Sequence, residues 1–262
     1  MDLDLKHRHA LVSGGSQGIG LAAARELAGL GASVTLMARR ADALQDAAAS
    51  LPTVDPSQHH AWLALDAADT DALRSAVDAL VAERPVHILV NNSGGPPPGP
   101  IRGADVAAFE AAWRQHLVAC HVLADAVLPG MEAAGYGRIV NVISTSVKEP
   151  LNGLGVSNST RWAVAGWAKT LATEVAPLGI TVNNVLPGST QTPRIEQIID
   201  AAAARTGRDR EDIKAGMFDA IPMRRFAQPG ETAAAIAFLC SPAAAYITGI
   251  NLPVDGGRTR SL

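Results

Sequence analysis

The sequence has few aromatic residues, few cysteines and no concentration of basic charge. Aromatic residues make up 4% of the 262 positions, and Cys120 and Cys240 are the only cysteines. Two cysteines are too few for a disulfide framework or a cysteine-ligated zinc site. Acidic and basic residues are mixed along the chain and give a net charge of −3. With no basic block or aromatic-interleaved basic patch, no nucleic-acid surface is predicted.

Long apolar runs are also missing. No stretch approaches the roughly 20 apolar residues that cross a bilayer, and the opening residues "MDLDLKHRHA" contain no apolar signal core. We therefore expect a cytoplasmic protein without a membrane partner. Hydrophobic residues nevertheless make up 48% of the chain, which argues against disorder and fits one large domain.

What the sequence does have is a regular alternation of strand-like and helix-like segments. Alanine-rich stretches with helical spacing, such as "GLAAARELAGLGA", separate short β-branched or apolar runs. These runs are "HALVSG", "SVTLMA", "HAWLAL", "HILVNN", "GRIVNVIS", "ITVNNVLP" and "NLPVDG". The alternation predicts strand–helix–strand units and right-handed crossovers. The expected fold class is α/β, a doubly wound parallel sheet with helices on both faces, in a single domain over residues 1–262.

Three longer segments stand out from this alternation. Two long helices are expected at 104–134 and 155–177, and each is apolar on more than one face, which is typical of a deeply buried or interface helix. Residues 93–100 read "SGGPPPGP" and predict a rigid loop. The polar, partly helical segment 189–228 is long for a connection, and we expect it to be a substrate lid.

A glycine turn follows the first predicted strand. The stretch "LVSGGSQGIG" places Gly14, Gly18 and Gly20 at the start of a helix, with Ser16, Gln17 and Ile19 between them. Glycine permits close backbone approach, and a helix N-terminus offers free N–H groups and partial positive charge to a pyrophosphate. The same letters spell the Gly-x-Ser-x-Gly of a hydrolase nucleophile elbow, but that chemistry needs a later histidine, and the last histidine is His121.

The glycine pattern, "NNSG" at 91–94, "LPG" at 186–188 and "YITGINLPVDGG" at 246–257 together resemble the short-chain dehydrogenase/reductase family over nearly the whole chain. The resemblance implies a single Rossmann-type domain, NAD(P) binding and a homo-oligomer, a tetramer or a dimer. The two long helices would then form one dimer interface.

The resemblance also implies a set of cofactor contacts. Asp66 and Ala67 would flank the adenine; Asn92, Ser93 and Gly94 would line the ribose side; Pro187, Gly188 and Thr190 would hold the nicotinamide end. Asp66 has a plainer interpretation as an acid at a helix N-terminus. Where an NAD-binding chain carries an acid after the second strand, this chain has Arg39 and Arg40, whose guanidinium groups suit a phosphate and favour NADP over NAD. The alternative is a solvated surface pair.

The catalytic set departs from the family's pattern of Asn, Ser, Tyr and Lys. Ser144 matches the serine, Ser157 stands thirteen residues later at the tyrosine's place, and Arg161 stands at the lysine's place. His116 occupies the asparagine's position. A phenol has a pKa of about 10, whereas an aliphatic hydroxyl is a far weaker and shorter acid. Arg161 can still donate to ribose hydroxyls and favour an oxyanion, but it will not shuttle protons.

His116 is the residue that could relay protons in the tyrosine's absence, since histidine titrates near neutrality. The plainer interpretation is a histidine that fills space or bonds a backbone carbonyl. Further candidate donors are Ser146, Lys148 and Asn158, whereas Tyr136 and Tyr246 are predicted to lie away from the site. His116 and Cys120 are one helical turn apart, but two ligands do not make a metal site.

Two functions follow from this set. The first is an NADP-dependent oxidoreductase that acts on a small carbonyl or alcohol substrate with a non-standard proton donor. The second is a non-catalytic dinucleotide-binding or partner subunit. The lid mixes apolar residues with arginines, which permits an apolar carbonyl compound or one bearing an acidic group.

Overall fold

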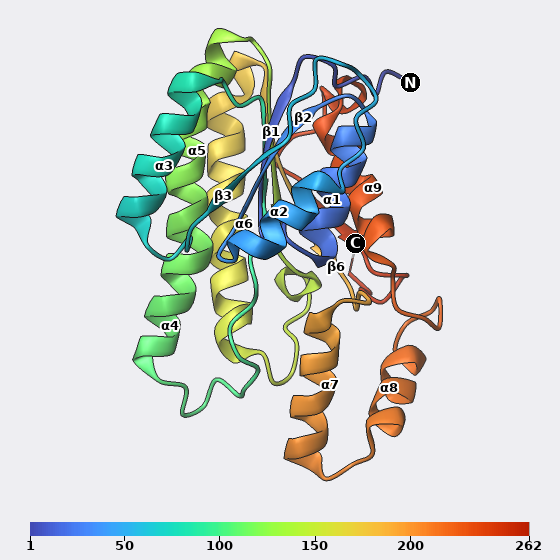
Figure 1. Ribbon diagram of the computed structural model, residues 1–262. Helices are drawn as coiled ribbons and strands as arrows, with labels where there is room; N and C mark the ends of the chain where they lie inside the picture. Colours follow the sequence, from blue (N-terminus) through green and yellow to red (C-terminus); the bar gives the residue numbers. More distant parts are fainter. Residues whose placement is uncertain (262) are drawn as a thin grey trace.

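The computed structural model, which describes residues 1–261, contains the predicted parallel sheet (Figure 1). Its strand order is β3-β2-β1-β4-β5-β6-β7, and every adjacent pair is parallel. The strands are β1 His9–Ser13, β2 Ser33–Ala38, β3 Ala61–Ala64, β4 Ile88–Asn91, β5 Gly137–Val142, β6 Ile180–Pro187 and β7 Asn251–Val254. Each lies within one of the predicted runs, and the order reverses between β1 and β4, so the doubly wound fold is confirmed.

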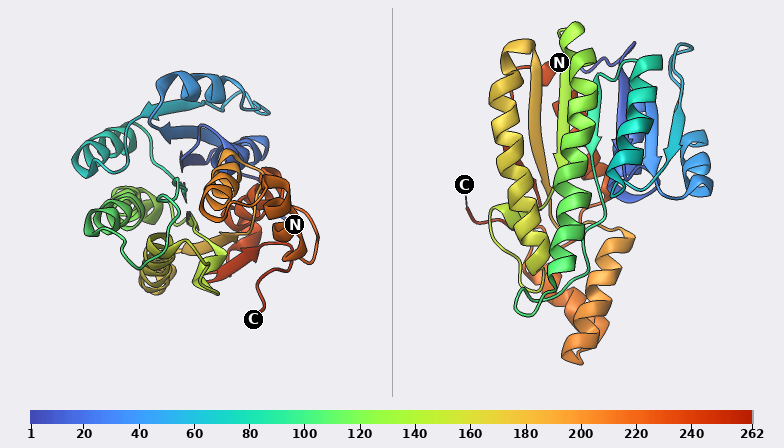
Figure 2. Two further views of the ribbon diagram at one scale, coloured as in Figure 1. Left: turned by 90° about the horizontal axis from the view of Figure 1, so that it is seen from below. Right: turned by 90° about the vertical axis from the view of Figure 1, so that its left-hand side faces the viewer.

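Helices cover both faces of the sheet (Figure 2). They are α1 Gly18–Gly29, α2 Ala41–Ala49, α3 Thr70–Glu83, α4 Val106–Trp113, α5 Ala119–Ala133, α6 Gly155–Val175, α7 Pro193–Thr206, α8 Arg210–Asp219 and α9 Pro229–Cys240. Helices α1, α2 and α9 pack on one face, and α3, α5 and α6 on the other. Alternation along β1 divides the two cores, since Ala10 and Val12 face the first layer while Leu11 faces the second. No helix among residues 1–261 is long and apolar enough to span a bilayer.

The two long predicted helices are present, with one change. The first consists of α4 and α5, which are joined by a π-helical turn at Arg114–Val118 that locally widens the helix. Single π turns inside helices are frequently found at functional sites. The second is α6, which begins beside the main cleft and runs away from it along the sheet (Figure 1).

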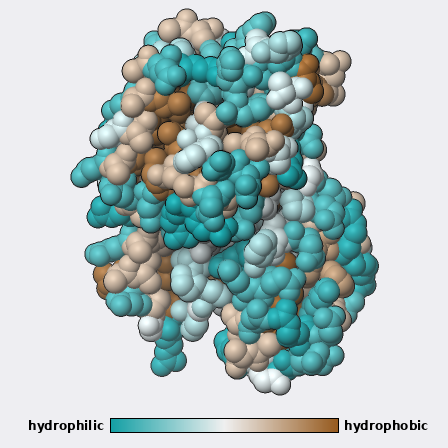
Figure 3. Space-filling view, viewed as in Figure 1, coloured by the Kyte–Doolittle hydropathy of each residue, from teal (hydrophilic) through white to brown (hydrophobic). Residues whose placement is uncertain are grey.

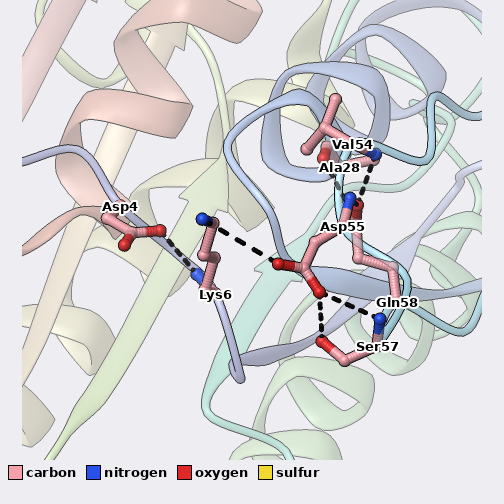
Figure 4. A network of polar contacts seen from close by, with 7 residues as sticks. All are labelled: Asp4, Lys6, Ala28, Val54, Asp55, Ser57 and Gln58. Carbon is pink, nitrogen blue, oxygen red and sulfur yellow. Dashed lines mark hydrogen bonds and ion pairs between the residues drawn. The ribbon is translucent and has the colours of Figure 1, made fainter.

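Buried Gln58 fastens the segment before β3 to the end of α1. Its side-chain nitrogen donates to the carbonyls of Ala28 and Ala32, both at 2.8 Å, and its oxygen accepts from the N–H groups of Val54 and Asp55. Figure 4 shows this network continuing to Asp55 and its neighbours. All the hydrogen-bonding groups of a buried amide are thus paired, which removes most of the cost of burying it.

Four asparagines form a ladder across adjacent strands. Asn91 donates to Asn141 at 2.9 Å, Asn141 to Asn184 at 2.9 Å, and Asn184 to Asn251 at 2.8 Å. The members are direct register partners on β4, β5, β6 and β7. The ladder therefore ties together strands whose carboxyl ends carry the loops of the site.

The predicted lid contains helices α7 and α8, which project below the carboxyl ends of the strands (Figure 1). A separate apolar cluster holds the segment together, built on Ile195, Ile199, Ile221 and Phe226. Both ends of the segment are joined, because Gln191 donates to Ala227 at 2.8 Å. The segment is thus a small packed unit at the mouth of the fold, and its closing over a substrate stays a prediction.

Candidate functional site

One large cleft, of about 1340 Å³, lies at the carboxyl ends of the strands and continues under α7. The space-filling view is hollowed at its lower edge, between the end of α4 with its adjoining loops and the α7–α8 pair (Figure 3). Most of the predicted site residues line this cleft: Gly14, Ser16, Gln17, Gly18, Ile19, Arg39, Arg40, Asp66, Ala67, Asn92, Ser93, Gly94, Ser144, Ser157, Arg161, Pro187, Gly188 and Thr190. Gly20 and His116 are not among the lining residues.

The turn between β1 and α1 has the geometry of an anion cradle. Gly14 and Gly18 both have φ of +60°, a region that side chains rarely adopt. A Cβ on Gly14 would come within 2.6 Å of the Asn92 backbone, so this glycine lets the two loops meet. Gln17 precedes the first turn of α1 without a side-chain cap, which leaves N–H groups directed at the cleft. Gly20 serves packing, since its missing Cβ leaves room for the Gly14 carbonyl.

The loop after β4 is fixed against this turn. The Asn92 N–H donates to the Ser13 hydroxyl at 2.9 Å, and the Asn92 side chain donates to the Gly14 carbonyl at 3.3 Å. A Cβ on Gly94 would meet nothing within 4 Å, so the wall of the cleft is open at this point. The rigid turn, the free N–H groups and the open wall together fit an extended dinucleotide.

The end of the cleft predicted to hold the adenine carries unpaired positive charge. Arg39 and Arg40 are exposed and line the cleft, and neither forms an ion pair with a carboxylate of residues 1–261. Asp66 also lines the cleft, but one of its oxygens accepts the Ala68 N–H at 3.0 Å. Asp66 therefore stabilises the turn before α3, whereas the helix itself is capped by Asp69, whose side chain accepts the Ala72 N–H.

At the end of the cleft predicted to hold the nicotinamide, the segment after β6 lies against β7. The Gly188 N–H donates to the Val254 carbonyl at 2.9 Å, and a Cβ on Gly188 would lie 2.7 Å from Asp255. Thr190 is buried, and its hydroxyl donates to the Gly188 carbonyl at 3.2 Å. Glycine is therefore required here for the close approach of β6 and β7.

Arg161 is the central charge of the site. It is 7% exposed, and its two terminal nitrogens donate to the Val142 carbonyl at 3.0 Å and the Ser93 carbonyl at 3.3 Å. Burial, together with the positive charge of Arg194, lowers the pKa of Arg161 to about 10. The side chain thus remains a cation at neutral pH, bonded only to neutral acceptors.

Of the candidate proton donors near Arg161, Ser144 and Ser157 line the cleft, whereas Ser146 and Lys148 do not. The Ser144 oxygen accepts the Ser146 N–H at 3.0 Å while still lining the cleft, and Ser157 lines the cleft from the first turn of α6. Asn158 is engaged with the Leu151 backbone, donating to its carbonyl at 2.9 Å. Neither Ser146 nor Lys148 is among the lining residues.

His116 lies on the π-helical turn, buried at 1% exposure. Its Nδ1 is 2.6 Å from the Ser93 hydroxyl, and its Nε2 has no partner within residues 1–261. Burial and the charges of Arg161 and Arg194 lower the pKa of His116 to about 2. The imidazole is therefore neutral at physiological pH, and it meets the cleft through Ser93.

The tyrosines are away from the cleft, as predicted. The Tyr136 hydroxyl donates to the Cys240 carbonyl at 2.6 Å, and its ring lies between the guanidinium groups of Arg8 and Arg138. Tyr246 is fully exposed. Neither tyrosine lines the cleft, so no phenol replaces the missing one.

The sequence did not identify Arg194 as a site residue, although it lines the cleft. It lies in the first turn of α7, donates to the Pro96 carbonyl at 2.7 Å and lies over Gly95. The Arg194 guanidinium thus joins the lid to the rigid loop after β4 and lines the cleft. The only signal in the sequence was a basic residue just after Pro193 in the predicted lid. Cys120 lines the cleft too, but burial raises the pKa of its thiol to about 12, so it is not a reactive thiolate.

Comparison with known proteins gives consistent matches. A profile for the family described as Enoyl-(Acyl carrier protein) reductase matches residues 14–259. The chain is 35% identical to cis-4-hydroxycyclohexanecarboxylate dehydrogenase of Sinomonas cyclohexanicum, covering 96% of each protein. It is 32% identical to 4-formylbenzenesulfonate dehydrogenase of Comamonas testosteroni, covering 98% of this chain and 99% of the relative.

Among solved structures, L-sorbose reductase from Gluconobacter frateurii in complex with NADPH and L-sorbose superposes with a TM-score of 0.92 at 33% identity, and the match covers 100% of both chains. The predicted fold is therefore confirmed, and so is the predicted resemblance to dehydrogenases and reductases.

Proposed function

Because the chain belongs to the short-chain dehydrogenase/reductase family, we propose that it is an NADP-dependent oxidoreductase acting on a small carbonyl or alcohol compound. The single observation that supports the proposal is the main cleft, which is open beside Arg161 and is lined by most of the residues predicted to hold a dinucleotide. The similar L-sorbose reductase structure contains NADPH, and Arg39 and Arg40 supply unpaired charge for a 2′-phosphate. We place the protein in the cytoplasm.

NADPH, when bound, supplies the hydride that reduces a carbonyl carbon, and the carbonyl oxygen must then receive a proton. Gly14 to Ile19 would hold the pyrophosphate, Asn92 to Gly94 the ribose side, and Pro187 to Thr190 the nicotinamide end. The protein's remaining task is to stabilise the oxygen as negative charge develops on it.

Arg161 suits that task electrostatically. It is a buried cation with no carboxylate partner within residues 1–261, held by two carbonyls and lining the cleft beside Ser157. A fixed charge in a partly dry site costs no reorganisation when the oxyanion forms. We assign Arg161 to the oxyanion and to the ribose hydroxyls, and Ser144 to hydrogen bonding of the substrate oxygen.

The proton path is proposed to run through Ser93 and His116. Both residues depart from the family's pattern, which has alanine and asparagine at these positions, and the two replacements contact each other at 2.6 Å. With a pKa near 2, His116 does not store a proton as imidazolium. For reduction, the Ser93 hydroxyl would donate its proton to the substrate oxygen, and the Nδ1–H of His116 would return a proton to Ser93. Nε2, which has no protein partner within residues 1–261, would then take a proton from a water molecule.

The pairing of two substitutions also bears on the second candidate function, a non-catalytic partner subunit. Residues that drift after loss of activity have no reason to form a new buried hydrogen bond beside the reacting centre. We therefore favour a rebuilt catalytic site over a vestigial one.

Absorbance at the nicotinamide band with NADPH and a panel of ring ketones, aldehydes and sugars tests the proposal, alongside calorimetric binding of NADPH. The expected result is turnover that falls by about 10²-fold or more in Ser93→Ala and His116→Ala, with the NADPH dissociation constant nearly unchanged. NADPH binding without turnover of any compound would support the partner subunit. Absence of NADPH binding would reject both functions.

We also propose a homo-oligomer, a tetramer or a dimer. Trp113 on α4 and Trp162 on α6 are 48% and 51% exposed, and Val106 is 70% exposed. Exposed tryptophans on neighbouring helices are typical of an interface. Light scattering should give a multiple of the 27.1 kDa chain mass, and Trp162→Glu should lower it.

A further inference from the structure

The substrate end of the main cleft is lined by arginines. Beyond Arg39 and Arg40, the lining includes Arg161, Arg194, Arg205, Arg208 and Arg258. None of these five forms an ion pair with a carboxylate of the described chain. The cleft therefore has a positive charge that the protein itself does not neutralise.

The acids nearby are already occupied. Glu149 lines the cleft, but its Oε1 accepts the backbone N–H groups of Arg260 at 2.7 Å and Ser261 at 3.2 Å. On the lid, Glu196 and Asp200 both bind Arg210 on the neighbouring helix. Arg210 thus removes the two carboxylates of α7 that could otherwise pair with arginines of that helix.

Arg194 is the arginine best placed to meet a substrate. It is half-buried, and it approaches from the lid while Arg161 approaches from the floor of the cleft. The two cations influence each other, since the charge of Arg194 lowers the pKa of both Arg161 and His116. Like charges held together in a partly dry cleft are unfavourable, and a bound anion would offset that cost.

The cofactor's phosphates have binding groups of their own. Under the proposed function, the helix N-terminus at Gly18 would hold the pyrophosphate, and Arg39 and Arg40 would hold the 2′-phosphate. The lining contributed by the lid helices and by the segment before α6 also includes apolar residues, namely Leu151, Leu154, Ile195, Ile198 and Met217. A compact apolar body ending in one anionic group would match this surface.

We propose that the substrate is a carbonyl or alcohol compound that carries a carboxylate or a similar anionic group, and that Arg194 binds this group. The proposal rests on the oxidoreductase function proposed above. Arg194 would then determine substrate specificity. Its hydrogen bond to the Pro96 carbonyl would also hold the lid over the bound substrate.

Paired ketones that differ only in charge test the proposal: 4-oxocyclohexanecarboxylate and 4-oxocyclohexanecarboxamide. The carboxylate should have the higher kcat/KM in the wild-type protein, by about 10- to 100-fold, the range expected for a charge-assisted hydrogen bond. Arg194→Gln should bring the ratio close to one, and Arg194→Lys should retain part of it. Arg25→Gln, an exposed arginine on α1 away from the cleft, is the matched control.

Two outcomes would overturn the proposal. In the first, Arg194→Gln lowers kcat/KM equally for the charged and the neutral ketone. In the second, Arg194→Gln weakens NADPH binding in calorimetry and leaves the ratio unchanged, which would assign Arg194 to the cofactor.

A binding experiment separates this proposal from the proposed function. Cyclohexanecarboxylate and cyclohexanecarboxamide are titrated into the NADP-loaded protein at low and high salt, where neither compound can be reduced. Salt-sensitive binding of the carboxylate alone, lost in Arg194→Gln, would support the anion site even if no ketone is turned over. Turnover of both ketones with no preference for carboxylate in either assay would reject the anion site and leave the oxidoreductase standing.

Discussion

The asparagine ladder gives the sharpest prediction about stability. Asn141 is 1% exposed and occupies the middle of the ladder, donating to Asn184 and accepting from Asn91. Asn141→Leu keeps nearly the same side-chain size but removes both hydrogen bonds. The Asn91 amide nitrogen and the Asn184 amide oxygen are then left unpaired in a buried layer of the sheet.

Each unpaired buried group costs about 1–3 kcal/mol, so the free energy of unfolding should fall by about 2–6 kcal/mol. Urea denaturation followed by circular dichroism, at fixed protomer concentration and without cofactor, measures the change. The loss should come as a lower midpoint with an unchanged slope, because the surface exposed on unfolding is almost the same.

Asn251→Leu is the control, at the exposed end of the same ladder. Only the Asn184 nitrogen loses a partner there, so the loss should be about 1–3 kcal/mol, roughly half of that expected for Asn141→Leu. Equal destabilisation by the two variants would refute the view that the buried ladder, rather than the choice of residue in a strand, provides the stability.

Three further predictions follow. Replacing Arg39 and Arg40 with serine should weaken NADPH binding in calorimetry by about 10- to 100-fold, the range expected when charged contacts to a phosphate are lost. NADH binding should stay nearly unchanged. Equal losses for the two cofactors would identify the pair as solvated surface charge. Ser157→Tyr combined with Arg161→Lys should raise reductase turnover, by up to about 10²–10⁴-fold if the phenol reaches the substrate oxygen; no gain would mean that the rest of the site has diverged as well. Burial holds the pKa of His9 at about 4, below its unfolded value of 6.5, so the unfolded chain binds the extra proton. The free energy of unfolding should therefore be unaffected by the titration of His9 above pH 6.5 and should fall as the pH drops towards 4, by up to about 3 kcal/mol. In thermal melts, the midpoint of His9→Gln should depend less on pH than that of the wild-type protein.

The strands and the glycine turn were predictable because their signals are local. Each run such as "HALVSG" shows its burial in a few consecutive residues, and Gly14 and Gly18 mark a conformation that other residues rarely adopt. The residues predicted to bind the cofactor line one cleft because parallel strands bring all their carboxyl ends to one edge of the sheet. The assignment of Ser157 and Arg161 to the places of the family's tyrosine and lysine rests on their spacing along one helix, and it stays a prediction.

The contacts that give those residues their chemistry were decided by the tertiary structure alone. Ser93 and His116 are 23 positions apart, and Arg194 meets Pro96 across 98 positions, so no local pattern relates them. The sequence determined that His116 would stand near the cleft. Only the packing of the π-helical turn against the loop after β4 buries His116, and burial together with the nearby arginines lowers its pKa and keeps it neutral. Charge balance likewise depends on which residues are neighbours in three dimensions. The sequence does not show that Arg210 pairs with Glu196 and Asp200, and that pairing leaves the arginines lining the cleft without a carboxylate partner from α7.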